Sequence, residues 1–124
     1  MPLLRDIDGT GPNQIDLAYA RGDSKAIPFT RVNKDGNRVN ITGRTYILTV
    51  DSRADPDDAS TKQFDSTGSI TDAANGELEF PITALSSGAL SAPQTYYFDI
   101  AETIGSNAET VAKGPFRVKM DVGK

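Results

Sequence analysis

Large apolar side chains occupy every second position in two segments of the chain, from Glu77 to Ile82 and from Tyr96 to Ile100. An alternation of period two places all of these side chains on one face of a β-strand. We therefore predict two strands that contribute the centre of a hydrophobic core, together with a last strand after residue 115. The predicted core consists of Leu78, Phe80, Ile82, Tyr96, Phe98, Ile100, Phe116 and Val118.

Weaker versions of the same pattern predict the last strand, at residues 116–120, and the remaining ones at residues 15–19, 26–30, 45–50, 62–64 and 69–71. The 45–50 segment has apolar side chains on both faces, so we expect it to be central in a sheet. Asp35-Gly36 and Asn75-Gly76 are strong turn signals, because Gly and Asn tolerate positive φ angles. Seven or eight short strands spaced by turns about every ten residues favour an all-β fold, an Ig-like antiparallel β-sandwich over residues 14–124.

Three prolines fall inside strand-like segments, at Pro28, Pro81 and Pro115. Proline has no backbone N–H and cannot donate a hydrogen bond to a neighbouring strand. We therefore expect each of them at a sheet edge or a bulge.

The first thirteen residues contain two glycines and two prolines and show no periodicity. We interpret residues 1–13 as an extended arm outside the sheets. Its apolar residues Leu3, Leu4 and Ile7 would need to be covered, so we expect the arm to lie on a neighbouring subunit.

Length and composition restrict the class of protein. A chain of 124 residues, 37% hydrophobic and 24% charged, is one globular domain that can bury a core. The net charge of −4 argues against binding of nucleic acid, which requires cations to neutralise phosphates. No apolar run reaches the ~20 residues of a membrane helix, and the start lacks the apolar stretch of a signal peptide. We expect neither membrane insertion nor export.

The charges are unevenly distributed along the chain. From Arg21 to Arg44 there are six cations against two carboxylates, and from Asp51 to Glu109 eleven carboxylates against two cations. Either these charges form an ordinary solvated surface, or a basic flank meets the acidic flank of another copy in a head-to-tail contact. The candidate interface residues on the second interpretation are Leu3, Leu4, Ile7, Arg31, Arg38, Asp57 and Glu79.

The residue types present exclude much catalytic chemistry. The chain has no His and no Cys, so Ser-His-Asp and Cys-His devices and zinc sites of the usual ligands cannot be built. Asp51, Asp55, Asp57 and Asp58 could supply oxygen ligands for Ca²⁺, but their spacing does not match an EF-hand, and we interpret them as a solvated loop. We expect no catalytic residues, no cofactor, no metal and no small-molecule substrate. Exposed aromatics for a sugar-binding platform are limited to Tyr97 and Tyr19.

Five short motifs in order resemble those of a known family. They are Arg21-Gly22-Asp23-Ser24 before Ile27-Pro28-Phe29, Asp35-Gly36-Asn37 with Val39-Asn40-Ile41-Thr42-Gly43, Thr71-Asp72-Ala73-Ala74-Asn75-Gly76, Thr95-Tyr96-Tyr97-Phe98-Asp99-Ile100, and Lys113-Gly114 before Phe116-Arg117-Val118. Together they resemble the N-terminal domain of the phage baseplate upper protein family and related small Ig-like tail proteins, and the resemblance extends over about residues 14–122.

The resemblance implies a non-enzymatic structural protein of a tailed-phage virion, assembled in the host cytoplasm. Its partners would be other phage virion proteins and copies of itself in a symmetric assembly, joined in the tail or baseplate by protein–protein contacts. Two alternatives stay open: a capsid decoration protein, and a carbohydrate-binding module that aids adsorption to the host.

Overall fold

The computed structural model describes residues 4–8, 13–14, 17–33, 36–53, 61–91 and 94–119, with side chains for 17–32, 36–53, 61–91 and 94–119. Strands dominate these residues. The elements are β1 (Leu4–Asp8), β2 (Asn13–Gln14), β3 (Leu17–Ala20), β4 (Ile27–Asn33), β5 (Thr45–Asp51), β6 (Lys62–Thr67), β7 (Ser69–Asp72), the 3₁₀ turn η2 (Ala73–Asn75), β8 (Glu77–Phe80), α1 (Ala84–Gly88), β9 (Gln94–Ile104) and β10 (Asn107–Lys119).

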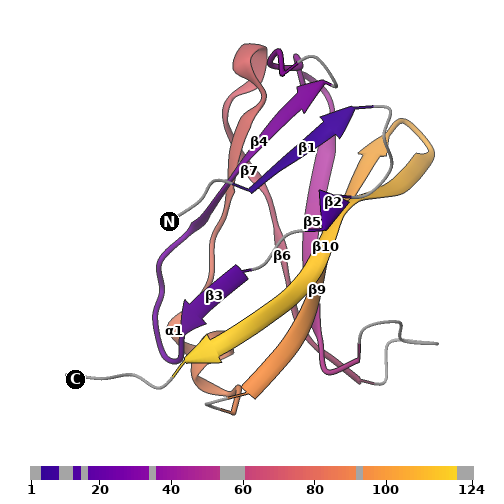
Figure 1. Ribbon diagram of the computed structural model, residues 1–124. Helices are drawn as coiled ribbons and strands as arrows, with labels where there is room; N and C mark the ends of the chain where they lie inside the picture. The colour runs from indigo at the N-terminus through magenta and orange to yellow at the C-terminus, as the bar shows by residue number, and fades with distance from the viewer. Residues whose placement is uncertain are drawn as a thin grey trace.

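The strands form two facing sheets, seen side by side in Figure 1. One has the order β1-β4-β8-β7, and the other β2-β10-β9-β5-β6, with β3 also paired to β10. The orders β4-β8-β7 and β10-β9-β5-β6 match B-E-D and G-F-C-C′ of variable-type immunoglobulin sandwiches. The predicted all-β sandwich is therefore confirmed.

All eight residues predicted to form the core are buried, and they pack with apolar residues of β3, β4 and β5 in one cluster. Phe98 of β9, for example, pairs with Val50 of β5 on one side and with Gly114 of β10 on the other. Fully burying a side chain of this size contributes about 1.5–3 kcal/mol. The alternation in the sequence thus predicted correctly which side chains of these strands face the core.

The position predicted for the 45–50 strand is also confirmed, because β5 lies between β9 and β6. Its residues Tyr46, Leu48 and Val50 point into the core, whereas Ile47 is 37% exposed on the outer face.

Two of the three prolines occupy local edges inside longer strands. Pro28 of β4 pairs with β8, but pairing with β1 starts only at the next residue, Phe29. Pro115 lies between the part of β10 that pairs with β2, which ends at Lys113, and the part that pairs with β3, which starts at Phe116. Pro81 follows the end of β8, so that strand is shorter than predicted.

The interpretation of residues 1–13 as an arm outside the sheets is wrong where the structure describes them. Leu4–Asp8 pairs in parallel with β4, from Leu4↔Phe29 to Asp8↔Asn33, and Asn13 pairs with Ala112 of β10. An edge strand is held by its backbone hydrogen bonds and needs no side-chain alternation, so the pattern could not reveal it. Leu3 lies outside the described residues, and Leu4 and Ile7 belong to β1. The sequence also did not predict that β1, β2 and β3 pair in parallel.

Two glycines lie where the Cβ atom of any other residue would collide with neighbouring atoms. Gly76 has φ +68°, and a Cβ there would lie 2.6 Å from the carbonyl oxygen of Val39 and 2.7 Å from that of Arg31. Gly68 separates β6 from β7, where the chain crosses between the sheets. Its N–H donates to the Tyr46 carbonyl at 2.7 Å, and a Cβ would lie 2.6 Å from Cδ1 of Leu78.

Candidate interaction surface

Arg31, predicted to lie on a basic surface, is in fact buried, with only 1% of its side chain exposed. It alternates with Ile27 and Phe29 along β4 and so points toward the other sheet. Its position between the sheets removes it from any interface with another protein. The prediction of Arg31 as an interface residue is therefore wrong.

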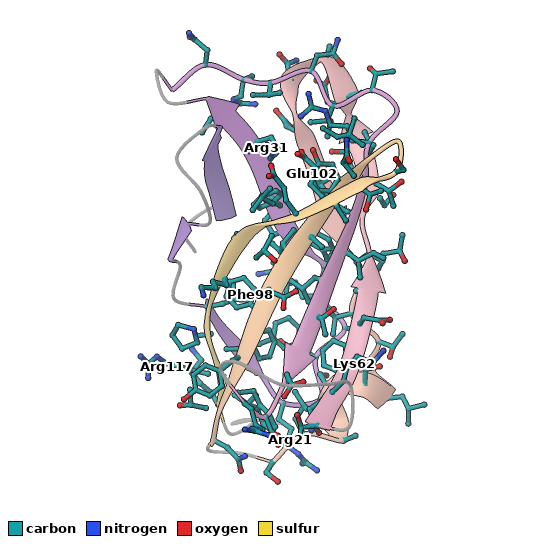
Figure 2. All side chains as sticks on the ribbon, turned by 90° about the vertical axis from the view of Figure 1, so that its right-hand side faces the viewer. Arg21, Arg31, Lys62, Phe98, Glu102 and Arg117 are labelled. Carbon is teal, nitrogen blue, oxygen red and sulfur yellow. The ribbon has the colours of Figure 1, made fainter. Side chains whose placement is uncertain are left out.

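The partner of Arg31 is Glu102 of β9, which is equally buried. The Arg31 guanidinium donates two hydrogen bonds to the carboxylate, Nε to Oε2 at 2.8 Å and Nη2 to Oε1 at 3.2 Å. Arg44 Nη1 donates to Oε2 at 3.3 Å, and the Tyr46 hydroxyl donates to the same oxygen. Figure 2 shows Arg31 and Glu102 together toward one end of the sandwich, far from Phe98 at its middle.

The hydrogen bonds decide the charge state of this group. Burial opposes ionisation of Glu102, but hydrogen bonds from Arg31 and Tyr46 outweigh it, so the pKa of Glu102 lies below its usual value. The pKa of Tyr46 is raised by burial and by its bond to that carboxylate, so the phenol stays protonated and acts as a donor. Arg31, Glu102, Arg44 and Tyr46 thus form a charged cluster that joins the two sheets, which we call the charged clamp.

The sequence contains a signal for this clamp that the distribution of charge along the chain does not reveal. Arg31 continues the inward alternation of Ile27 and Phe29, and Glu102 continues that of Phe98 and Ile100. Two opposite charges, each in phase with the core positions of its strand, indicate a buried pair.

Of the remaining predicted interface residues, the structure describes the side chains of Arg38 and Glu79. Arg38 Nη1 lies 2.6 Å from Oε2 of Glu77 in the same chain, an exposed ion pair, and also donates to the Asn75 carbonyl. Glu79 is exposed on β8. Asp57 lies outside the described residues. The basic segment is thus partly neutralised within the chain, which weakens the argument for a head-to-tail contact.

The opposite end of the sandwich is closed by hydrogen bonds to backbone groups, one of them from Arg21 Nε to the Leu90 carbonyl at 2.7 Å. The Tyr96 hydroxyl accepts a hydrogen bond from the N–H of Ser91 at 2.9 Å. This matches the tyrosine corner of immunoglobulin sandwiches, where a tyrosine near the start of strand F bonds to backbone a few residues upstream. The Ser87 hydroxyl of α1 donates to the Asp23 carbonyl at 2.6 Å. Thr83 caps α1, because its side chain accepts a hydrogen bond from the Ser86 N–H.

Tyr19, one of the two tyrosines considered for a sugar platform, is buried in the core. Its ring stacks on Phe116 with centroids 5.9 Å apart, and its hydroxyl donates to the Lys25 carbonyl at 2.6 Å. Burial raises its pKa to about 12. Of the two candidates only Tyr97, which is half-buried on the outer face of the six-stranded sheet, keeps an accessible ring.

The outer face of the six-stranded sheet is the surface best suited to contact a partner. Cross-strand partners share a face, so three rows of side chains cross β10, β9, β5 and β6 on this side. The rows are Pro115–Tyr97–Asp51–Lys62, Lys113–Asp99–Thr49–Asp65 and Thr110–Ala101–Ile47–Thr67. The row of Ala101 and Ile47 carries no charge, the row of Tyr97 also contains Asp51 and Lys62, and the middle row has the most charged groups.

Asp99 of the middle row lies near charged residues of both signs, Asp51 and Lys113. Its half-burial and the nearby Asp51 charge raise its pKa, whereas Lys113 lowers it. Within the described part of the chain Asp99 forms no ion pair. Asp51 itself is held at the strand end by hydrogen bonds from the Arg53 N–H at 2.9 Å and the Thr61 hydroxyl at 2.6 Å.

Among the described residues, no group of three or more His, Cys, Asp or Glu side chains is arranged to hold a metal ion. The described helices include none with the length and apolar character required to cross a membrane.

No protein-family model matches the chain, and no curated protein shows significant similarity to it. Among solved structures, the chain is similar to an uncharacterized protein from Bacillus anthracis strain Ames, at 14% identity and a TM-score of 0.40, over 88% of this chain and 85% of the other.

Proposed function

We propose that this chain is a non-enzymatic structural protein of a tailed-phage virion, in which the sandwich joins tail or baseplate components by protein–protein contact. The observation that carries the proposal is the broad outer face of the six-stranded sheet, where apolar groups such as Ile47 and Tyr97 alternate with charged ones. Aromatic and aliphatic groups surrounded by polar ones are typical of protein interfaces.

The positions of the resemblance motifs support the same proposal. Gly22, Gly36 and Gly76 all have positive φ angles, as the turns in these motifs require. The Thr95–Ile100 motif supplies both core side chains and the tyrosine corner. The motifs therefore describe one sandwich, which is the fold that the resemblance implies.

The experiment is to look for the protein in particles. Phage particles induced from the organism that carries the gene are purified on a density gradient, probed with an antibody, and labelled with gold for electron microscopy. We expect the protein to co-purify with particles and the label to lie on the tail or baseplate. Label on the head would favour capsid decoration instead. Absence of the protein from intact particles would contradict a virion role.

A glycan array with the purified domain tests the carbohydrate-binding alternative. We expect no specific binding, because Tyr97 is half-buried among strand neighbours and not exposed as a stacking platform. Specific binding that Tyr97→Ala abolishes would favour the sugar-binding module over the structural role.

A further inference from the structure

The charges on the outer face of the six-stranded sheet are unevenly distributed over its strands. Outward positions of β10 carry the cations Lys113 and Arg117, whereas the carboxylates Asp99 and Asp65 belong to β9 and β6. On β6 the cation Lys62 lies beside Asp65, with which it forms an exposed ion pair. Figure 2 shows Arg117 at the side of the sheet where β10 runs. In the middle row, the cation Lys113 and the carboxylate Asp65 therefore lie at opposite sides of the sheet.

Two copies of such a face can pack about a twofold axis that lies either across the strands or along them. An axis across the strands places β10 on β10, and the cations of one copy then face those of the other. An axis along the strands between β9 and β5 places β10 over β6 and β9 over β5. The second arrangement brings opposite charges together, and like charges directly opposed cost several kcal/mol.

We propose that two copies of this chain pair through the outer faces of their six-stranded sheets, about a twofold axis parallel to the strands. A rotation about this axis keeps each row at its own height. In the middle row, Lys113–Asp99–Thr49–Asp65, the Lys113 ammonium of one copy then lies over the Asp65 carboxylate of the other.

The adjacent row supplies the apolar part of the contact. Ala101 and Ile47 are neighbours in this row. The same rotation places Ala101 of one copy over Ile47 of the other, and Ile47 of the first over Ala101 of the second. Ile47 is one of the large apolar residues left exposed in the described part of the chain. Facing sheets pack about 10 Å apart with interdigitating side chains, so a branched Ile47 opposite a small Ala101 is a sterically suitable pair.

The environment of Asp99 is consistent with this pairing. Its carboxylate is half-buried, and the nearby Lys113 forms no ion pair with any of the described residues. In the dimer the Thr49 hydroxyl of the second copy lies over Asp99 and can donate a hydrogen bond to it. Asp65 has an exposed ion pair with Lys62 at 3.1 Å, which is solvent-screened and weak, so it can exchange for Lys113 of the second copy.

Self-association of this kind is a property of the isolated protein and does not depend on the virion role. A protein that dimerises but is missing from particles would contradict the proposed function alone.

A charge swap tests both the face and the axis. The wild type, Lys113→Glu, Asp65→Lys and the double variant are compared by sedimentation equilibrium at low salt. Glu79→Lys, which makes the same charge change as Asp65→Lys on an exposed position of β8 in the other sheet, is the matched control. Circular dichroism melting of each variant checks that it is folded.

We expect each single reversal to weaken the dimer at least tenfold, because the two symmetric contacts both become repulsive. The double variant should return to within about threefold of the wild-type dissociation constant, and Glu79→Lys should leave it unchanged. A wild type that stays monomeric at about 1 mM, or a double variant no tighter than the singles, overturns the proposal. If Lys113→Glu tightens the dimer instead, cation faces cation and the axis assignment is wrong.

Discussion

The two ends of the sandwich are closed by different interactions: a buried ion pair at one end and hydrogen bonds to backbone groups at the other. At the hairpin end, next to the β9–β10 turn, the sheets are joined by the buried ion pair of Arg31 and Glu102. At the helix end, next to α1, they are closed by hydrogen bonds to backbone groups, such as that between Tyr96 and Ser91 and that from Arg21 Nε to the Leu90 carbonyl. A buried ion pair is strong only while both partners are present and ionised, whereas a hydrogen bond to a backbone group is weaker and does not require an ionised carboxylate.

The largest effect is expected from removing one half of the charged clamp. Arg31→Met leaves the Glu102 carboxylate buried without its main partner, which should lower the free energy of unfolding by about 3–5 kcal/mol. Urea denaturation at fixed protein concentration measures this. The double variant Arg31→Met with Glu102→Leu should recover most of the loss, because neither charge then remains buried. A double variant as unstable as the single one would show that packing, and not charge, closes this end.

A core substitution between the two ends separates packing from charge. Phe98→Ala should cost roughly 3–5 kcal/mol, through lost burial and the cavity it leaves. Unlike the loss in Arg31→Met, this loss should be the same at pH 4 and pH 7. A thermal midpoint within a degree or two of wild type would contradict the register in which Phe98 faces the core.

The pH dependence should differ between the ends. Because the folded-state pKa of Glu102 lies below the reference value of 4.5, its stabilisation is present above that pH and is lost as the pH falls through the folded-state pKa. The measurement is the difference in unfolding free energy between wild type and Glu102→Gln from pH 7 to pH 3. We expect this difference to shrink below about pH 4.5. The raised pKa of Asp99 acts in the opposite direction, but it is common to both proteins and cancels.

At the helix end, Tyr96→Phe should cost about 1 kcal/mol, because the Ser91 N–H loses its acceptor while the ring stays in the core. This cost should not vary between pH 4 and pH 7. A loss as large as that of Arg31→Met would mean that the two ends do not differ in the way described.

The smallest effect is expected at the exposed pair of Arg38 and Glu77, where both side chains are nearly half exposed. Arg38→Gln should change stability by less than about 1 kcal/mol, and high salt should remove even that. A larger loss would indicate that this pair, and not only the buried one, supports the hairpin end.

The local pattern of the sequence predicted one set of features well. Alternation in β8, β9 and β10 identified which side chains enter the core, because a strand has two faces whatever it pairs with. The turn at Asn75-Gly76 and the cap of Thr83 follow from local backbone chemistry in the same way. The candidate interface was predicted less well. Of the charges predicted for a shared surface, Arg31 is buried and Arg38 is paired within the chain.

What the sequence by itself determined is therefore the strands of the core, the side chains that face inward and the positions that must turn. Only the tertiary structure decided which strands are neighbours, and hence which charges meet. Arg31 and Glu102 are 71 residues apart, and no local pattern specifies a pairing across that separation. The same holds for Leu4–Asp8, which becomes a strand only because the edge of β4 offers it unpaired backbone groups. Row Lys113–Asp99–Thr49–Asp65 likewise exists only once four strands are in register.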